Sequence, residues 1–352
     1  MGRIIPESKE IYKIIFDDFF KAPIYIGDKD KFKELINSMK EEKNFEEAKR
    51  LAKQWVNLKK DKFKINYHGK FINLGQKTAI MGILNITPDS FSDGGIYYKN
   101  IDKAIERISQ MLDEGADIID IGGESTRPGA EPVSTFEELE RVIPIIKEAR
   151  KQLGNDFFIS IDTYKAKVAE EALKAGADIV NDISAMSFDK DMAKVVADFD
   201  CPVILNHIKG TPKNMQKNPY YDDVIEEIIN FLEQQIDYGI KKGIREDRFI
   251  IDPGIGFGKN VEHNVEIIKR LLELKILGLP ILIGISRKSF IGLILKNLLG
   301  KSEYPPKERI NGTLAATAIA VLNGAHIVRV HDVKETAEFL TILDTIRGYR
   351  LV

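Results

Sequence analysis

From residue 78 onward, short runs rich in Ile and Val alternate with longer segments whose apolar residues recur every three or four positions. The short runs are typical of buried parallel strands, and the longer segments predict amphipathic helices. Strands are predicted over residues 79–84, 118–121, 157–161, 179–180, 203–205, 249–251, 281–284 and 327–330. Eight alternating strand–helix units predict an α/β protein with a (β/α)8 TIM barrel.

Three of these units repeat one pattern, in which a Gly that follows a helical segment leads into a β-branched pair and then a polar residue. The repeats begin at Gly115, Gly176 and Gly324 and end in Asp120, Asn181 and Arg329. The Gly is placed where a helix C-cap is expected. A buried strand has no structural reason to end in a polar residue, whereas a barrel carries its site at the C-terminal rim of its strands. An open doubly wound sheet is the alternative, but no G-x-G-x-x-G motif opens a helix after the first strand.

The first 77 residues follow a different pattern. Residues 32–58 have helical periodicity, and residues 65–74 hold two strand-like runs around His68, Gly69 and Lys70, which predict a hairpin. We therefore divide the chain into an N-terminal α/β appendage of residues 1–77 and a barrel of residues 78–352. The appendage carries 18 Lys and Arg against 12 Asp and Glu. A nucleic-acid-binding arm is disfavoured, because these charges alternate in sign as on a solvated helix face.

Composition narrows the class of protein. With 43% hydrophobic and 30% charged residues, the 352-residue chain is predicted to fold around a full core. A net charge of −2 does not predict nucleic-acid binding, and no apolar run reaches the roughly 18 residues of a membrane-spanning helix. The first dozen residues lack the apolar stretch of a secretory signal. Together with a single cysteine, Cys201, these features are compatible with a cytoplasmic protein.

Polar residues gather where the predicted strands end. The loop of residues 85–95 has the length and composition of a mobile lid, and the loop of residues 122–129 has hydroxyls and an Arg suited to an anion. The carboxylate of Asp252 and the carboxamide of Asn181 match the donor and acceptor edge of a 2-aminopyrimidinone ring. Arg329 or Phe257 can stack on such a ring.

The same rim favours a phosphorylated ligand. Arg and His side chains beside a backbone-rich loop can hold a diphosphate. One Asn and no carboxylate cluster on the first loop indicate at most a loosely held Mg²⁺, shared with the substrate phosphates. The five histidines form no H-x-x-x-H or H-x-H pair, which argues against zinc. Considered alone, His207 is as readily a core histidine as a ligand.

Seven motifs resemble, in order, the signature of the dihydropteroate synthase family. They lie at residues 81–95 (MGILNITPDSFSDGG), 120–130, 160–163, 181–183, 252–259, 286–289 and 329–333. The resemblance extends from residue 78 to the C-terminus and implies a pterin-binding barrel, a cytoplasmic transferase of folate biosynthesis and a target of sulfonamides. In that family, (7,8-dihydropterin-6-yl)methyl diphosphate and 4-aminobenzoate give 7,8-dihydropteroate and diphosphate.

The resemblance also implies roles for individual residues. The implied pterin contacts are Asp162, Asn181, Asp252 and Lys288. The residues implied to hold diphosphate and Mg²⁺ are Asn85, Arg329 and His331, and Arg329 also stacks on the pterin. The implied 4-aminobenzoate site is Thr126, Arg127, Pro128 and Ser289. Phe257 and Gly284 line the pocket between the two, and Ile183 is a further substrate-binding residue. The implied catalytic group is Asp162, Lys288, Arg329 and His331, for an SN1-like loss of diphosphate.

Two features depart from the family pattern. Asn206 stands where the family usually has Met, so the pterin pocket is expected to have a more polar wall. The leading 77 residues are longer than in a minimal synthase, and their hairpin is expected to cover the N-terminal end of the barrel. The family often dimerises through its last helices, so a homodimer is expected, although the apolar stripe from Val333 to Leu343 fits a core equally well.

Three related functions remain open. A methyltransferase that moves a methyl group from methyltetrahydrofolate to a corrinoid shares the carboxylate and Asn pair, but it does not need Lys288, Arg329 or His331. A synthase that uses a modified arylamine is compatible with every motif. A pterin-binding protein without catalysis is disfavoured, because every expected catalytic position is filled.

Overall fold

The computed structural model describes residues 2–6, 12–16, 24–26, 29–41, 44–88, 94–300 and 303–349. Its centre is a parallel sheet in the order β11-β10-β9-β8-β7-β6-β13-β12. The strands are β6 (Ala79–Asn85), β7 (Ile118–Gly122), β8 (Phe158–Asp162), β9 (Ile179–Asp182), β10 (Val203–Asn206), β11 (Phe249–Asp252), β12 (Leu282–Ile283) and β13 (Ile327–Val330). A parallel bridge between Ile251 and Ile281 joins the two outer strands. The sheet therefore closes, and the predicted TIM barrel is confirmed.

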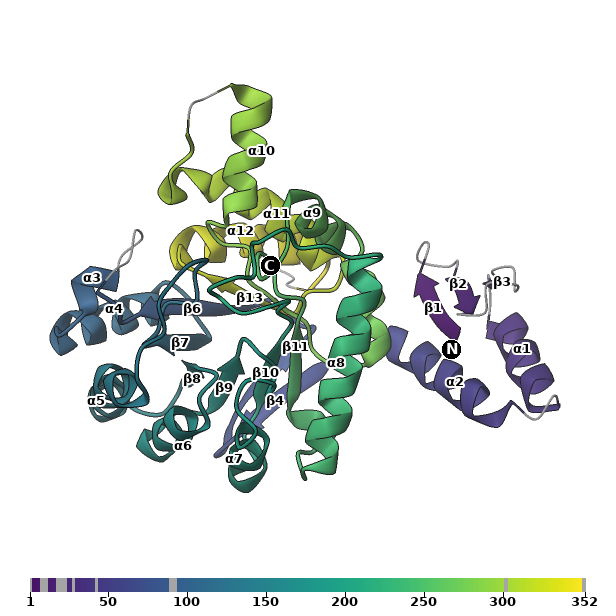
Figure 1. The fold of residues 1–352 in the computed structure, drawn as a ribbon, viewed down its shortest axis with the longest axis horizontal. Coiled ribbons are helices and arrows are strands. Elements are labelled where there is room, and N and C mark those ends of the chain that lie inside the picture. The colour runs from purple at the N-terminus through teal and green to yellow at the C-terminus, as the bar shows by residue number, and fades with distance from the viewer. Residues whose placement is uncertain are drawn as a thin grey trace.

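Helices surround this barrel (Figure 1). They are α3 (Gly94–Tyr97), α4 (Ile101–Asp113), α5 (Thr135–Leu153), α6 (Ala166–Ala175), α7 (Met192–Phe199), α8 (Val224–Lys241), α9 (Val261–Lys269), α10 (Ser289–Leu299), α11 (Ile310–Leu322) and α12 (Val333–Ile346), with 3₁₀ turns η1 (Glu246–Arg248), η2 (Leu271–Leu277) and η3 (Pro306–Arg309). α8 shows how the sequence specifies them: Asp223 caps its first turn, and the predicted stripe through Ile228 and Leu232 is buried. Among the residues described, no helix has both the length and the apolar character needed to span a bilayer.

The repeated sequence pattern corresponds to a repeated turn. Gly115, Gly176 and Gly324 have φ angles of 104°, 116° and 102°, and each lies just after the end of a helix, α4, α6 or α11. Gly takes such angles with little strain, so the chain can leave each helix and enter the next strand within a few residues. The predicted helix ends are confirmed, and the polar ends of the repeats lie on β7, β9 and β13.

The N-terminal segment contains more elements than predicted. The helical pattern of residues 32–58 forms two helices, α1 (Lys29–Glu41) and α2 (Phe45–Leu58), beside an antiparallel sheet of β1 (Gly2–Pro6), β2 (Tyr12–Phe16) and β3 (Ile24–Ile26). Periodicity did not reveal that the helical segment is interrupted, because the apolar residues of both helices pack into one core. In that core Trp55 stacks on Phe32 at 4.3 Å between ring centres and meets the edge of Tyr12 at 4.8 Å.

The predicted hairpin is confirmed as β4 (Phe63–Tyr67) and β5 (Lys70–Leu74), joined at His68 and Gly69, both with positive φ. It contacts the segments that lead into the barrel strands. Tyr67 donates a hydrogen bond to the carbonyl oxygen of Phe199 at 3.2 Å, and Lys70 pairs with Asp178. The hairpin thus covers the N-terminal end of the barrel, as expected.

The remaining N-terminal elements dock on the outside of the barrel, beside α8 (Figure 1). Arg3 donates a hydrogen bond to Asn230 of α8 at 2.7 Å. Asn57 of α2 donates from Nδ2 to the carbonyl oxygen of Ile276, also at 2.7 Å. These contacts hold the N-terminal elements against α8 and η2.

Candidate active site

A cavity of about 420 Å³ opens at the C-terminal ends of the barrel strands. All the site residues predicted from the sequence line it: Asn85, Thr126, Arg127, Pro128, Asp162, Asn181, Ile183, Asp252, Phe257, Gly284, Lys288, Ser289, Arg329 and His331. These residues span nearly 250 positions of the chain, and closure of the barrel brings them into one pocket. Their individual roles stay predictions.

The three polar residues that end the sequence repeats meet at one carboxylate oxygen. Asp120 Oδ2 accepts hydrogen bonds from Arg329 Nε at 2.6 Å and from Asn181 Nδ2 at 3.1 Å. The same guanidinium donates from Nη2 to Asp162 Oδ2 at 2.6 Å. Asp120 is fully buried and is absent from the predicted site, although its place in the repeat is a signal that could have identified it.

Burial sets the charge balance of this group. It raises the pKa of Asp162, an effect to which the negative charge of Asp120 adds and which Arg329 opposes. For Arg329, burial opposes the charged form, but Asp120 and Asp162 hold its pKa above the usual value. The guanidinium is therefore a permanent cation between two carboxyl groups.

A second pair of titratable groups lies across the cavity. Burial raises the pKa of Asp252 to about 6, although Oδ1 accepts a hydrogen bond from the backbone N–H of Gly254 at 2.7 Å. Burial and the charge of Arg329 lower the pKa of Lys288 to about 8. Its Nζ lies 4.4 Å from the centre of the Phe257 ring. A carboxyl and an ammonium group that titrate near neutral pH beside an aromatic wall suit a flat, polar heterocycle.

His331 contributes a neutral imidazole. Its Nδ1 lies 3.0 Å from Ser286 Oγ, which also accepts a hydrogen bond from the backbone N–H of His331 at 3.2 Å. Burial, together with the positive charges of Arg287 and Arg329, lowers its pKa well below the usual value. A neutral imidazole can donate one hydrogen bond to an anion, while Arg329 supplies the positive charge.

The other side of the cavity is formed by loops. Thr126, Arg127 and Pro128 belong to the loop between β7 and α5, and Ser289 is the first residue of α10. The predicted lid, residues 85–95, falls partly outside the description, because residues 89–93 are not described. Asn85, the first residue of that loop, ends β6 and lines the cavity.

Asn206 is buried in the cavity wall, and its carboxamide is committed to the backbone. Nδ2 donates to the carbonyl oxygens of Ile183 at 2.9 Å and His207 at 3.2 Å. A thioether is nevertheless present in the wall, from Met215 in the loop after β10. His207 lies outside the cavity lining, buried against Lys259 Nζ at 2.9 Å, so it is a core histidine.

Several lining residues were not predicted from the sequence. They are Ile83, Thr87, Glu124, Ser125, Met215, Ile255, Gly256, Ser286, Arg287, Pro306 and Arg309. Some lie inside the recognised motifs, and their proximity to assigned residues is the only signal that could have found them. Met215 lies in the loop after β10, and Pro306 and Arg309 belong to η3. No sequence pattern marks these three residues.

The donor set bears on the Mg²⁺ that the resemblance implies. Within the described ranges, no three His, Cys, Asp or Glu side chains converge to hold a metal. Asn85 Oδ1 and Asp162 Oδ2 each lie 3.6 Å from the position that a Cβ on Gly122 would occupy. One amide oxygen beside a carboxylate that already binds Arg329 fits an ion that takes most of its ligands from diphosphate and water.

Comparison with known proteins agrees with this site. Residues 81–331 match the family model described as pterin binding enzyme. Dihydropteroate synthase from Synechocystis is 49% identical over 272 residues, which are 77% of this chain and 91% of that protein. The sulfonamide complex of Yersinia pestis dihydropteroate synthase has 42% identity and a TM-score of 0.76, covering 82% of this chain and all of that one. The Xanthomonas albilineans enzyme with 4-aminobenzoic acid has 39% identity and a TM-score of 0.73, covering 82% and 99%. The chain therefore belongs to the dihydropteroate synthase family of pterin-binding enzymes.

Proposed function

We propose that the protein joins (7,8-dihydropterin-6-yl)methyl diphosphate to 4-aminobenzoate, producing 7,8-dihydropteroate and diphosphate for folate biosynthesis. The observation that carries this proposal is that four charged side chains converge in one cavity: Asp162, Asp252, Lys288 and Arg329. The loop that contains residues 126–128 lines the same cavity. Structures of the related Xanthomonas albilineans enzyme contain 4-aminobenzoic acid in one case and 7,8-dihydropteroate in another. The proposal assigns the pterin to the polar side chains of this cavity and 4-aminobenzoate to its loops.

The pterin is held at the deep end of the cavity. Asp252 accepts from the ring N–H and the exocyclic amine, and Asn181 supplies both a donor and an acceptor. Lys288 donates to a ring carbonyl or nitrogen, and the planar guanidinium of Arg329 stacks on the ring face. Asn181 and Asp252 are buried and line the cavity, which supports the assignment, because polar groups that converge on a pocket fix the orientation of a ligand.

Loss of diphosphate precedes attack by the amine. The bond between the pterin methylene carbon and the diphosphate oxygen breaks, and its electron pair leaves with the oxygen. Asp162 faces the cation that remains, while Arg329 and His331 bind the departing anion. The arylamine nitrogen then forms the new C–N bond and releases one proton. When bound beside Asn85, Mg²⁺ would reduce the charge of the diphosphate and make it a better leaving group.

The arylamine subsite depends on the loops. We assign 4-aminobenzoate to Thr126, Arg127, Pro128 and Ser289, and we propose that the loop of residues 122–129 closes over the diphosphate and completes this subsite. Ordered closure predicts that 4-aminobenzoate binds at least about tenfold more tightly when the pterin site holds diphosphate. Equal affinity with and without diphosphate, measured by calorimetry, would exclude the closure.

The test of the reaction is diphosphate release by the full chain with the pterin diphosphate and Mg²⁺. We expect release that depends on 4-aminobenzoate, with 7,8-dihydropteroate as the product. If release occurs only with a substituted arylamine, the substrate assignment changes while the site assignment stands. Pterin binding with no release under any condition would instead identify a non-catalytic relative.

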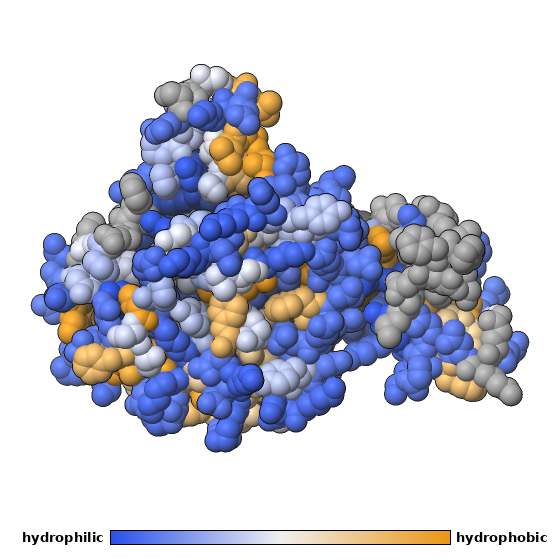
Figure 2. Space-filling model, in the orientation of Figure 1, coloured by the Kyte–Doolittle hydropathy of each residue, from blue (hydrophilic) through white to orange (hydrophobic). Residues whose placement is uncertain are grey.

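A second part of the proposal concerns assembly. The last three helices expose a set of large apolar side chains, and Figure 2 shows hydrophobic residues along α10. The exposed residues are Leu293, Leu298 and Leu299 of α10, Ile319 and Leu322 of α11, and Ile342 and Ile346 of α12. We propose that a second copy of the chain covers them, because large apolar side chains exposed on neighbouring helices of the chain favour association. Light scattering should report a dimer, and Leu322→Asp should shift it to a monomer.

Location and domain organisation complete the proposal. Cys201 is free and buried, and burial raises its pKa to about 12, so the fold needs no disulfide and suits the cytoplasm. We propose that residues 1–77 act as a structural appendage and that residues 78–352 carry the reaction. The contacts of the appendage with α8, η2 and the base of the barrel support this division, because none of them involves the cavity.

A further inference from the structure

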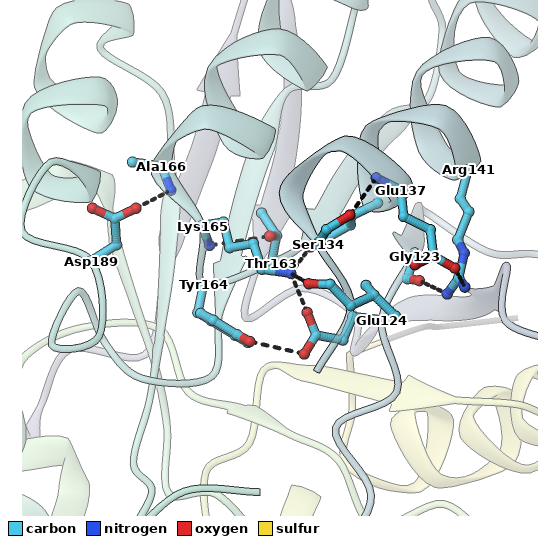
Figure 3. Close-up of polar contacts among 12 residues, drawn as sticks. Gly123, Glu124, Ser134, Glu137, Arg141, Thr163, Tyr164, Lys165, Ala166 and Asp189 are labelled. Atoms are coloured by element: carbon cyan, nitrogen blue, oxygen red, sulfur yellow. Dashed lines mark hydrogen bonds and ion pairs between the residues drawn. The ribbon is translucent and has the colours of Figure 1, made fainter. Parts of the chain in front are cut away.

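The loop of residues 123–134, which carries Thr126–Pro128, is held at both of its ends by one side chain from a neighbouring segment. Lys165 precedes α6, and its ammonium group lies between the beginning and the end of the loop (Figure 3). Nζ donates to Glu124 Oε2 at the beginning and to the carbonyl oxygen of Val133 at the end, at 2.8 Å. A third hydrogen bond reaches Glu138 Oε2 of α5 at 2.6 Å.

Neighbouring contacts also fix the beginning of the loop. The Tyr164 hydroxyl donates to Glu124 Oε1 at 2.8 Å, so both oxygens of this carboxylate are engaged. Arg141 donates to the carbonyl oxygen of Gly123 at 2.7 Å, and a Cβ on Gly123 would lie 2.8 Å from Val142 Cγ1. The first residues of the loop are therefore pressed against α5, and Figure 3 shows these contacts converging on the loop.

The charges in this cluster are buried and unequal in number. The side chains of Glu138, Glu124 and Lys165 are 1%, 7% and 15% exposed. Burial raises the pKa of Glu138, and the ammonium group of Lys165 opposes that rise. One cation thus compensates two buried carboxylates, and its removal would leave like charges facing each other in a region of low dielectric.

Lys165 is outside the lining of the cavity, whereas Glu124 is part of it. The backbone N–H of Lys165 donates to Thr163 Oγ1 at 3.2 Å, one residue after Asp162. We call the contacts of Lys165 with Glu124, Val133 and Glu138 the clamp. The clamp connects the segment that carries Asp162 to the loop that carries the proposed arylamine residues. Asp252, at the end of β11, and Lys288, just before α10, come from the other side of the barrel.

We propose that Lys165 is a positioning residue that sets the geometry of the arylamine subsite by clamping both ends of the loop of residues 123–134. This inference rests on the proposed function, in which Thr126–Pro128 and Ser289 hold 4-aminobenzoate. Without the ammonium group, the two carboxylates separate or take up a proton, and the loop loses the side chain that ties its end to its beginning. The arylamine site then loosens while the pterin site keeps its own hydrogen bonds.

The test compares Lys165→Met with Lys165→Arg and with Lys167→Met. Lys167 lies on the exposed face of α6 and pairs with Glu170 and Glu171 of the same helix, so its variant controls for loss of a lysine from this segment. In Lys165→Met we expect KM for 4-aminobenzoate to rise about tenfold or more, as a loosened positioning loop implies. The dissociation constant of 6-hydroxymethyl-7,8-dihydropterin, measured by calorimetry, should stay within about twofold, since its contacts are unchanged.

A second readout needs no turnover. Backbone hydrogen exchange of residues 124–133 in the substrate-free enzyme should become about tenfold faster in Lys165→Met and return most of the way in Lys165→Arg. Equal changes in the arylamine and pterin constants, or unchanged exchange in the loop, would overturn the proposal. If Lys165→Met does not fold, Glu124→Gln replaces it, because this variant weakens the contact of Lys165 with the beginning of the loop. The same two measurements, the substrate constants and the hydrogen exchange of the loop, then decide. If the wild type fails to make dihydropteroate, the proposed function fails, and hydrogen exchange still decides whether Lys165 clamps the loop.

Discussion

Both ends of the barrel contain buried charged groups, but the partners of these groups differ between the two ends. At the N-terminal end, Asp178 is paired with Lys70 and Arg150 and also accepts a hydrogen bond from the Ile159 N–H at 2.9 Å. At the C-terminal rim, Asp252 and Lys288 share a cavity, and the pKa of each group is shifted towards neutrality. Buried charge that is fully partnered serves the fold, whereas buried charge that faces a cavity is available to a ligand.

The largest expected effect comes from removing charge at the rim. Asp162→Ala and Lys288→Ala should each lower kcat for 4-aminobenzoate-dependent diphosphate release on the order of 10³-fold, because each removes a preorganised group beside the separating charges. Both variants should still fold, since Arg329 keeps its hydrogen bond to Asp120 when Asp162 is replaced. Unchanged turnover in both variants would contradict our assignment of the site.

Removing charge at the N-terminal end should have the opposite signature. Asp178→Asn leaves Lys70 and Arg150 without their buried carboxylate and should lower the free energy of unfolding by about 3 kcal/mol. Urea denaturation measures this loss, with Asp198→Asn as the control, because Asp198 belongs to an exposed pair with Lys194. Turnover of the folded Asp178→Asn enzyme should equal that of the wild type. If Asp178→Asn kept its stability but lost activity, the conclusion that the N-terminal charges serve the fold rather than the reaction would be wrong.

The pKa of Asp252 predicts how pterin binding depends on pH. Asp252 must be a carboxylate to accept two hydrogen bonds from the pterin, and burial raises its pKa to about 6. Affinity should therefore be constant between that pH and about 8, where Lys288 begins to lose its proton, and fall up to about tenfold per unit below pH 6. Calorimetry with 6-hydroxymethyl-7,8-dihydropterin measures this profile, and Asp252→Asn should bind weakly without the acid limb. A wild-type profile that is flat down to pH 5 would exclude Asp252 as the acceptor.

The smallest effect is expected in the appendage. Asn57→Ala removes the hydrogen bond to the Ile276 carbonyl and should lower the free energy of unfolding by about 1 kcal/mol. Val56→Ala, at an exposed position next to it, is the matched control. Neither change should affect kcat or KM, because the contact lies away from the cavity. A clear loss of turnover in Asn57→Ala would give the appendage a part in catalysis.

Much of the barrel could be predicted because its signals are local. The β-branched runs mark all eight strands, and the Gly of each repeat needs a positive φ at the end of its helix. β12 is shorter than its predicted range of residues 281–284, since Ile281 makes only an isolated bridge to β11. In the appendage, the sheet of β1–β3 was missed because its short strands show no clear alternation beside polar and aromatic residues.

The site was predictable to the extent that the family motifs contain it. Recognition of the motifs placed residues such as Asp162 and Arg329, but the roles of Asp120 and Lys165 depend on which side chains meet after the barrel closes. Met215 reaches the cavity from a loop without a repeated pattern. Contacts between segments that lie more than 40 residues apart leave no periodicity in a single sequence, so geometry alone reveals them.

The pairing of β6 with β13 has a consequence for the order in which the protein is made. β6 is the first barrel strand to be synthesised, and its neighbour β13 is the last, about 250 residues later. At a typical rate of 5–20 residues per second, the nascent chain waits on the order of tens of seconds before the barrel can close. Arg329 lies on that final strand, so the hydrogen-bonded group around Asp120 is completed only in the last stage of synthesis. A chain that terminates before residue 327 therefore lacks both the closing strand and Arg329, and we expect such a product to be inactive.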